Sequence, residues 1–361
     1  MIILGIESSC DDTSAAIIKA PSSPSGLHRA SFSILAEKTA SQIEVHKKYG
    51  GVVPEIAGRK HAENILPVIE EVIKHSNIQT SKHPNIDAIA VTAGPGLITG
   101  LLVGVEAAKT LSYLWDIPLI GVNHIEGHIH SVELTKENNI EFPALCLIVS
   151  GGHTELVLMK DHGKYKLIGK TRDDAAGETF DKIAKLIGFE YPGGAKISKT
   201  AEGGNTKAID FPRPMINDKS YDFSFSGLKT AALYWLRDNT KQKNIKNNSK
   251  PTTYELPATA LNDFCASFEQ AIVDVLVAKT IRAVKKYKPK TIILSGGVSA
   301  NKKLRETLKE KNPGTELLLP ELKYTMDNAA MIAVAGYYHA LKKEFTNWKD
   351  IEACPNWTVY S

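Results

Sequence analysis

The sequence predicts an α/β protein made of two similar lobes that face each other across a cleft. Residues 2–19 and 144–159 each read as an apolar strand, a small polar turn and a second apolar strand. Residues 86–109 and 290–308 each read as a strand, a glycine-rich loop and a helix. Because these elements recur in the same order, they indicate a duplicated unit. A cleft between two such lobes suits a nucleotide.

Helices are expected between these strands. The patterns at 54–75 and 264–287 have apolar residues at helical spacing. A polar stretch closes the first half, so we expect an N-terminal lobe of residues 1–140 and a C-terminal lobe of residues 141–361. The last helical pattern, 327–343, could pack on either lobe.

The composition is that of a soluble globular protein. Of the 361 residues, 43% are hydrophobic and 23% are charged. No apolar run reaches the roughly 20 residues of a membrane span, and the N-terminus lacks the basic start of a signal peptide. We therefore expect a cytoplasmic protein without a membrane association. The four cysteines form no C-x-x-C pair, which argues against a zinc knuckle and a disulfide framework.

The net charge of +4 does not by itself establish nucleic-acid binding. Lysines are dense at 241–250 and 282–290. The first of these stretches is polar and poor in apolar residues, which predicts a solvated loop rather than a dedicated RNA contact.

Residues 123–130 read NHIEGHIH and contain a pair of histidines, His124 and His128, at helical spacing. A helix turns about 100° per residue, so both imidazoles can reach one metal ion. In the zinc-protease motif H-E-x-x-H the acid follows the first histidine directly. Here Glu126 is one position later and points away from the metal face, which argues against a protease. An amphipathic helix with two polar residues is the alternative, and His130 is expected at the surface.

Two histidines need a further ligand. Asp327 precedes the apolar helical pattern near the C-terminus, where its carboxylate can cap the helix. The same carboxylate is the best remaining candidate for an anionic third ligand.

Several other stretches are unusually polar or rich in glycine. Glycines in SGGHT (150–154) let a ligand approach the backbone, and the loop GGVSAN (296–301) opens a helix whose N–H groups suit phosphate. Asp181 lies on a short helix within 173–194 that ends in Pro-Gly-Gly, and three acids occupy the first hairpin turn at 7–12. Ordinary turn chemistry and an exposed ion pair are the alternatives.

Ten motifs occur in the order found in one protein family. They are GIESSCDDT, YGGVVPE, GPGLITGLLVG, NHIEGHI, SGGHTELV, DDAAGETFDK, YPGG, DFSFSGLKTA, SGGVSAN and DNAAMIA. The chain thereby resembles the TsaD family, the bacterial tRNA adenosine threonylcarbamoyltransferases once labelled O-sialoglycoprotein endopeptidases. The resemblance extends from about residue 3 to about residue 340.

The resemblance implies a duplicated actin-like and Hsp70-like (ASKHA) fold. It implies transfer of the threonylcarbamoyl group from threonylcarbamoyl-AMP to N6 of adenosine 37 in tRNAs that read codons beginning with adenine, which forms t6A. It also implies one divalent metal per chain, Fe²⁺ with Zn²⁺ as the alternative, held by His124, His128 and Asp327.

The resemblance further implies an adenine nucleotide in the cleft and a set of residues that bind the donor. These are Ile148, Val149, Ser150, Gly151, Gly152, Asp181, Gly194 and Asn301. Further cleft positions are Glu7, Asp11, Asp12, His153, Thr154, Gly296 and Gly297. One departure is Ser198, where many relatives carry an acid, so a ribose contact there is in question.

The implied partners are the tRNA substrate, TsaB as a heterodimer partner, the ATPase TsaE and a TsaC-type enzyme that supplies the adenylate. Helix 54–75 is a candidate partner surface, and an ordinary core helix is the alternative. Rival functions are an ATP-dependent kinase or ATPase, a metalloprotease, and a non-enzymatic TsaB-like subunit. A kinase does not need a histidine pair aligned with Asp327, and that combination favours a catalytic member of the family.

Overall fold

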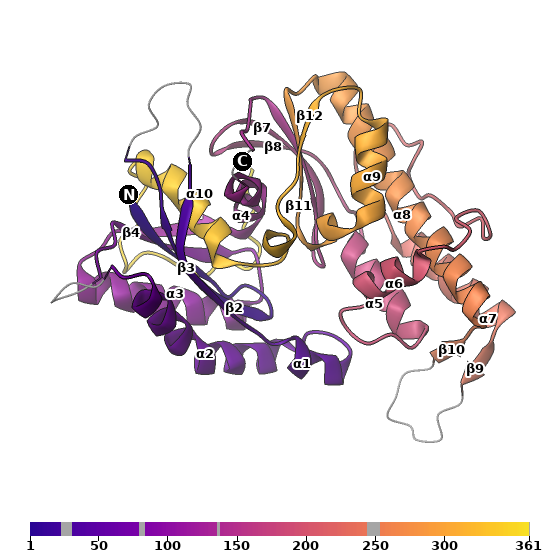
Figure 1. Ribbon diagram of the computed structural model, residues 1–361, viewed down its shortest axis with the longest axis horizontal. Coiled ribbons are helices and arrows are strands. Elements are labelled where there is room, and N and C mark those ends of the chain that lie inside the picture. The colour runs from indigo at the N-terminus through magenta and orange to yellow at the C-terminus, as the bar shows by residue number, and fades with distance from the viewer. Residues whose placement is uncertain (23–30, 79–83, 136–137, 244–252, 361) are drawn as a thin grey trace. The chain divides into compact units, whose positions relative to one another are not determined.

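The computed structural model describes residues 1–22, 31–78, 84–135, 138–243 and 253–360 (Figure 1). Contacts group the chain into two compact units, and the predicted lobe boundary at 140–141 stays a prediction. Unit 1 comprises residues 1–141, 159–165 and 318–361, and unit 2 comprises residues 142–158 and 166–317. Most of the lysine-rich stretch 241–250 lies outside the described residues.

A five-stranded sheet forms the centre of unit 1, in the order β3-β2-β1-β4-β5. Strands β1, β2 and β3 are antiparallel neighbours, and β1, β4 and β5 run parallel. The strands are β1 Ile2–Glu7, β2 Asp12–Lys19, β3 Ser33–Ser41, β4 Ala88–Gly94 and β5 Leu119–Asn123.

Helices cover both faces of this sheet (Figure 1). Side chains alternate along a strand, so Ile3 packs with α10 (Ala329–Leu341), whereas Leu4 packs with α2 (Pro54–His75) and α3 (Ile98–Trp115). The apolar final helix therefore belongs to the core of unit 1. The remaining helical segments are α1 Ile43–His46, η1 Lys47–Tyr49, α4 His124–His130, η2 Ser131–Leu134 and η4 Leu322–Tyr324.

The sheet of unit 2 repeats this topology in the order β12-β11-β6-β7-β8. Strand β6 takes the place that β1 has in unit 1. The hairpin strands β7 and β8 follow on one side of β6, as β2 and β3 follow β1, and the parallel strand β11 lies on its other side, as β4 does in unit 1. The turn between β7 and β8 groups with unit 1. The strands are β6 Ala144–Val149, β7 Thr154–Asp161, β8 Lys164–Lys170, β11 Thr291–Ser295 and β12 Glu316–Leu318.

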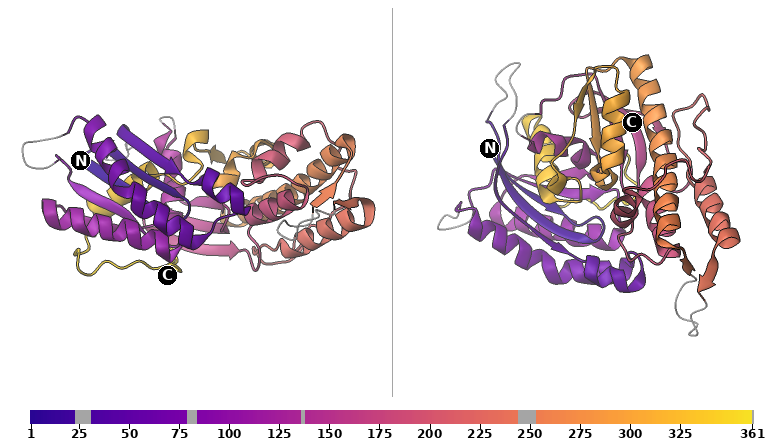
Figure 2. Two further views of the ribbon diagram at one scale, coloured as in Figure 1. Left: turned by 90° about the horizontal axis from the view of Figure 1, so that it is seen from below. Right: turned by 45° about the vertical axis from the view of Figure 1, so that its right-hand side comes forward.

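The helices of unit 2 include the long α8, which runs beside α9 in the right-hand view of Figure 2. A small hairpin of β9 and β10 follows α7. These elements are α5 Ala176–Leu186, α6 Gly194–Ala201, α7 Ser226–Asn239, β9 Lys241–Lys243, β10 Thr253–Glu255, α8 Ala258–Tyr287, η3 Gly297–Ala300 and α9 Lys302–Lys311.

The repeated strand order confirms the duplicated α/β fold predicted from the sequence. Helix α2 begins and ends where the apolar pattern predicted. It buries Ile65, Val68 and Ile69 in the core, whereas Leu66 remains 58% exposed. Among the helices of the described residues, none is long and apolar enough to cross a lipid bilayer.

We predict that Gly5→Ala destabilises unit 1. A Cβ atom at Gly5 on β1 would lie 2.1 Å from the carbonyl oxygen of Ala329 at the start of α10, so the helix would have to move. Overpacking of this kind costs about 1–3 kcal/mol. Gly227→Ala is the matched control, because its Cβ would meet nothing closer than 3.7 Å. Thermal unfolding should show a lower Tm for Gly5→Ala only, and equal Tm values would contradict the packing.

Candidate metal centre

Helix α4 follows β5 directly and carries the histidine pair. Asn123 caps it, because its side-chain oxygen accepts the N–H of Ile125 at 2.9 Å. The helical spacing then brings the rings of His124 and His128 to 4.6 Å between centroids. Both side chains are almost fully buried.

Asp327 meets this pair from the start of α10. The helix cap is Asn328, whose side chain accepts the N–H of Met331 at 2.9 Å, so Asp327 does not serve as the cap. One Asp327 carboxylate oxygen, Oδ1, lies 3.2 Å from Nε2 of His128 and 3.5 Å from Nε2 of His124. Potential ligand atoms of all three residues lie within 4.8 Å of one another.

The chemistry of this cluster fits a divalent metal ion. Within the described part of the chain, neither ring nitrogen of His128 makes a hydrogen bond, although the side chain is fully buried. A buried polar nitrogen without a hydrogen bond is costly unless another partner is provided. Two imidazoles and one carboxylate form a ligand set used for Fe²⁺ and Zn²⁺.

Glu7 orients the first histidine. Nδ1 of His124 lies 2.9 Å from one Glu7 carboxylate oxygen, Oε2, which also accepts the hydroxyl of Thr92 at 2.7 Å. The other oxygen, Oε1, accepts the backbone N–H of Ser9 at 2.5 Å. A carboxylate behind a metal-binding histidine fixes its tautomer and makes the ring more basic. Glu7 thus turns Nε2 of His124 toward Asp327.

Charge compensation controls protonation at this site. Burial alone would lower the pKa of His124, but the charges of Asp327 and Glu7 raise it to about 9. Burial would raise the pKa of Glu7, and the neighbouring His124 outweighs it, so the pKa is lowered. The pKa of the nearby Cys10 thiol is raised by burial and by Asp11, which disfavours a thiolate ligand.

The other acids of the first hairpin lie close to this centre. Asp12 and Asp327 both line a cavity of about 350 Å³. Burial raises the pKa of Asp12 to about 7. Asp11 lies beside Cys10 and contributes to the raised pKa of its thiol.

The opposite side of α4 is anchored by a buried polar network. Glu126 points away from the metal cluster, as predicted, and accepts the hydroxyl of Tyr165 at 2.8 Å. Its second oxygen lies 2.9 Å from Nε2 of His339 on α10. The sequence did not predict the contact between Glu126 and His339, because these two residues are 213 positions apart.

The expected surface position of His130 is wrong. The side chain is 0% exposed, because the β7–β8 turn and α10 cover this end of α4. Its Nδ1 lies 2.5 Å from Glu133, which also accepts the hydroxyl of Tyr338 at 2.5 Å. His130, Glu133 and His162 form a second group of possible ligand atoms. Since Glu133 is already engaged by His130 and Tyr338, we interpret this group as an anchor for α4.

In unit 2, the loop after β6 is open to a ligand. Gly151 and Gly152 are exposed, and a Cβ atom at either would meet nothing within 4 Å. Ile148 and Val149 are buried strand residues that precede the loop. The carbonyl of Ser150 accepts the N–H of Gly177 at the start of α5, at 3.2 Å.

Three of the remaining cleft candidates have structural roles here. The hydroxyl of Thr154 accepts the N–H of Ala176 at 2.9 Å, and the carbonyl of His153 accepts the N–H of Ser150 at 2.8 Å. Gly296 has φ +85°, and a Cβ there would lie 2.5 Å from the carbonyl oxygen of Val149. This close approach brings the Gly296–Gly297 turn next to the end of β6.

The candidates on α5, α6 and α9 are tied together by side chains. Asp181 accepts the N–H groups of Gly193 and Gly194 at 2.7 and 3.3 Å. Asn301 caps α9 and donates its amide to Ser198 at 2.8 Å and to Glu269 at 2.6 Å.

Glu269, on α8, was not identified from the sequence. Its pKa is raised by burial, although hydrogen bonds from Ser198 and Asn301 oppose the shift. An acidic side chain thus does lie beside Ser198, supplied by another helix. A glutamate within a long apolar helix gives little signal in the sequence, because such residues are usually exposed.

Comparison with known proteins identifies close relatives over nearly the whole chain. A family model described as "TsaD: tRNA N6-adenosine threonylcarbamoyltransferase" matches residues 33–334. A protein of that name from Listeria innocua is 48% identical over 358 residues, covering 98% of this chain and 95% of that protein. One from Bacillus cereus is 49% identical over 338 residues, covering 93% and 90%.

Solved structures of more distant proteins share the fold. HypF from T. kodakarensis superposes with a TM-score of 0.59 at 14% identity, covering 95% of this chain and 48% of that one. The activator of 2-hydroxyisocaproyl-CoA dehydratase from Clostridium difficile, with bound ADPNP, gives 0.50 at 13% identity, covering 95% and 97%. At these identities the likeness supports the predicted ASKHA-type fold alone.

We predict that Glu7→Gln weakens metal binding. The amide would not carry the negative charge that holds the Nδ1 proton of His124, so the imidazole would be a poorer and less ordered ligand. Loss of such an outer partner typically lowers metal affinity by about 10–100-fold. Competition with a chelator measures this, and Glu44→Gln, at an exposed position, is the control. Equal affinities would show that Glu7 does not support the site.

Proposed function

This chain belongs to the TsaD family of tRNA N6-adenosine threonylcarbamoyltransferases, and from this premise we propose which residues carry out its reaction. The enzyme transfers a threonylcarbamoyl group to N6 of an adenosine in tRNA. One observation supports the assignment of the metal-binding residues: His124, His128 and Asp327 converge on one point. The imidazole of His128 is fully buried there and makes no hydrogen bond to any of the described residues.

We propose threonylcarbamoyl-AMP as the donor. Attack by N6 on the carbamoyl carbon forms the new C–N bond and breaks the bond to the phosphate oxygen. AMP leaves with the electron pair of that bond, and the adenine amine gives up one proton to solvent water. Because AMP is a stable anion, the leaving group needs no protonation, and the main demand is on binding, orientation and charge stabilisation.

His124, His128 and Asp327 are proposed to hold one divalent metal ion, Fe²⁺ with Zn²⁺ as the alternative. When bound, such an ion acts as a Lewis acid that stabilises negative charge on an oxygen of the reacting group. Glu7 keeps His124 in the tautomer that presents Nε2. Asn123 fixes the start of α4, so that both imidazoles project from one face.

Residues of unit 2 are proposed to bind the nucleotide part of the donor. The exposed backbone of Gly151 and Gly152 can donate N–H groups to phosphate oxygens. Asp181 holds the Gly193–Gly194 turn, and Asn301 lies between Ser198 and Glu269. These carboxylates and the amide are suited to accept and donate hydrogen bonds with ribose hydroxyls.

The proposed partners follow from family membership. TsaB is the proposed heterodimer partner, TsaE the accompanying ATPase and a TsaC-type enzyme the source of the adenylate. The exposed side of α2, which includes Leu66, is the proposed contact surface. A kinase or protease function has no support beyond the shared fold and an old family label.

We predict that Asp327→Ala abolishes most transferase activity. Removal of the carboxylate leaves only two of the three proposed ligands, so the metal should be lost and t6A formation should fall by at least about 100-fold. The assay combines the protein with its proposed partners, threonine, bicarbonate, ATP and unmodified tRNA, followed by nucleoside mass analysis. Asp350→Ala, at an exposed carboxylate, is the control.

Equal t6A yields from the native protein and Asp327→Ala would leave the reaction intact and remove the metal assignment. Absence of t6A with the native protein, in a mixture where a relative produces it, would contradict the donor or partners proposed here.

A further inference from the structure

The charges of the chain are divided unequally between the two units. Unit 2 contains 27 lysines and arginines but only 18 aspartates and glutamates, a formal net charge of +9. The whole chain carries only +4, so unit 1 is acidic. A polyanion such as tRNA is therefore attracted to unit 2.

Several of these cations gather around two tyrosine rings at the end of α8. The guanidinium of Arg282 lies 5.0 Å from the centre of the Tyr221 ring. The ammonium of Lys286 lies 5.6 Å from that ring and 5.4 Å from the ring of Tyr287. Lys286 is exposed, as are Lys219, which precedes Tyr221 on the same loop, and Arg172, which pairs with Asp222. We call this set the Tyr221 patch, comprising Arg172, Lys219, Tyr221, Arg282, Lys286 and Tyr287.

The loop that carries Lys219 and Tyr221 is held in place by two cations of α8, the half-buried Arg282 and the buried Lys279. Arg282 donates to the carbonyl of Asp218 at 2.6 Å and also to that of Ser220. Lys279, which is fully buried, donates to the same Ser220 carbonyl at 3.0 Å. Because the backbone is fastened at both carbonyls, the patch is preorganised, which lowers the entropy cost of binding.

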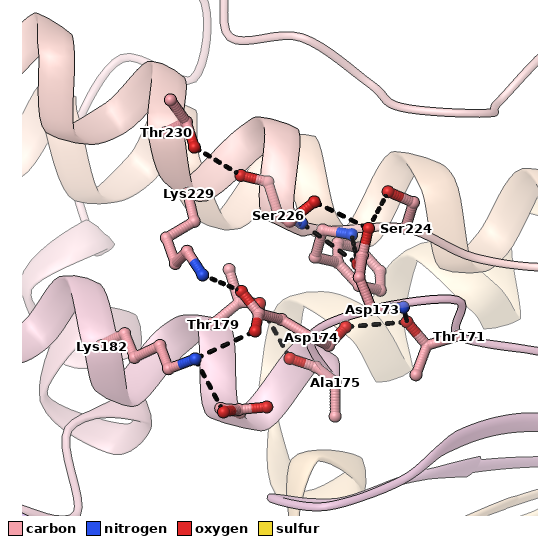
Figure 3. A network of polar contacts seen from close by, with 12 residues as sticks. Thr171, Asp173, Asp174, Ala175, Thr179, Lys182, Ser224, Ser226, Lys229 and Thr230 are labelled. Carbon is pink, nitrogen blue, oxygen red and sulfur yellow. Dashed lines mark hydrogen bonds and ion pairs between the residues drawn. The ribbon is translucent and has the colours of Figure 1, made fainter.

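The patch is directly connected to the loop proposed to bind the donor. The carbonyl of Phe223 accepts the N–H of Arg172 at 2.9 Å, and Arg172 pairs with Asp222 at 2.9 Å. The next residue, Asp173, accepts hydrogen bonds from Ser224 and Ser226, as Figure 3 shows. Asp174 lies between Lys182 and Lys229 in the same view.

This ordered segment leads within a few residues to the donor loop. Gly177, at the start of α5, donates its N–H to Ser150 at 3.2 Å. A Cβ atom at Gly177 would lie 2.5 Å from the Ser150 carbonyl oxygen, so the two backbones are in close contact. Arg172 therefore lies on the segment that leads to the proposed donor loop, and Lys219 lies on the neighbouring loop to which Phe223 joins that segment.

We propose that the Tyr221 patch binds the sugar–phosphate backbone of the tRNA substrate near the adenosine that is modified. This proposal rests on the transferase function. The cations Arg282 and Lys286 lie against the tyrosine rings, which favours contacts to phosphates over stacking of bases on those rings. Phosphate contacts orient a nucleic acid without reading its sequence, which suits an enzyme that acts on several tRNAs.

The test is a double variant, Lys219→Glu with Lys286→Glu, in the full-length chain. Binding of unmodified tRNA is measured by fluorescence anisotropy over a series of salt concentrations. We expect the Kd to rise by about tenfold or more, and the slope of log Kd against log salt to fall by about one for each lost phosphate contact. Lys309→Glu, at an exposed lysine of α9, is the matched control.

A second measurement separates this proposal from the function on which it rests. In the complete t6A reaction, the double variant should show a raised KM for tRNA, whereas its affinity for AMP should match that of the native protein. If the Kd, the salt slope and the KM for tRNA all equal those of Lys309→Glu, the patch does not bind tRNA. Failure of the native protein to form t6A while it still binds tRNA would contradict the proposed donor or partners and leave the patch standing.

Discussion

The close packing of α10 on α4 is the constraint on which the proposed metal centre depends, because it joins His124 and His128 to Asp327, about 200 residues later in the sequence. Gly127 lies at this contact, where a Cβ atom would come within 2.6 Å of the end of the Ile332 side chain. The bond between Glu126 and His339 fixes the same two helices on the side away from the ligands. Asp327 reaches His128 only while this contact is intact.

The electrostatics of the site follow from burial. Glu7 and His124 are nearly inaccessible to water, and each would lose its charge if it were buried alone. Together with Asp327 they compensate one another, which favours a protonated His124 in the absence of metal. At the proposed metal site a bound cation would replace that proton, which would couple metal binding to proton release.

The sequence was sufficient for features that depend on local spacing. The duplicated hairpins, the glycine loops and the shared face of His124 and His128 all follow from periodicity. Contacts between distant segments were not predictable. His130 looked exposed because nothing local shows that the β7–β8 turn covers it. Asp327 and Asn328 are adjacent and both cap helices well, so only the structure could assign that role to Asn328.

X-ray absorption spectroscopy of the metal-loaded protein would test the proposed ligands, because it identifies the atoms bound to the metal. We expect nitrogen and oxygen ligands only, with the multiple-scattering signal of two imidazoles that is lost when His124 and His128 are replaced. A sulphur ligand, or a spectrum unchanged by those replacements, would contradict the assignment of the metal to α4 and Asp327.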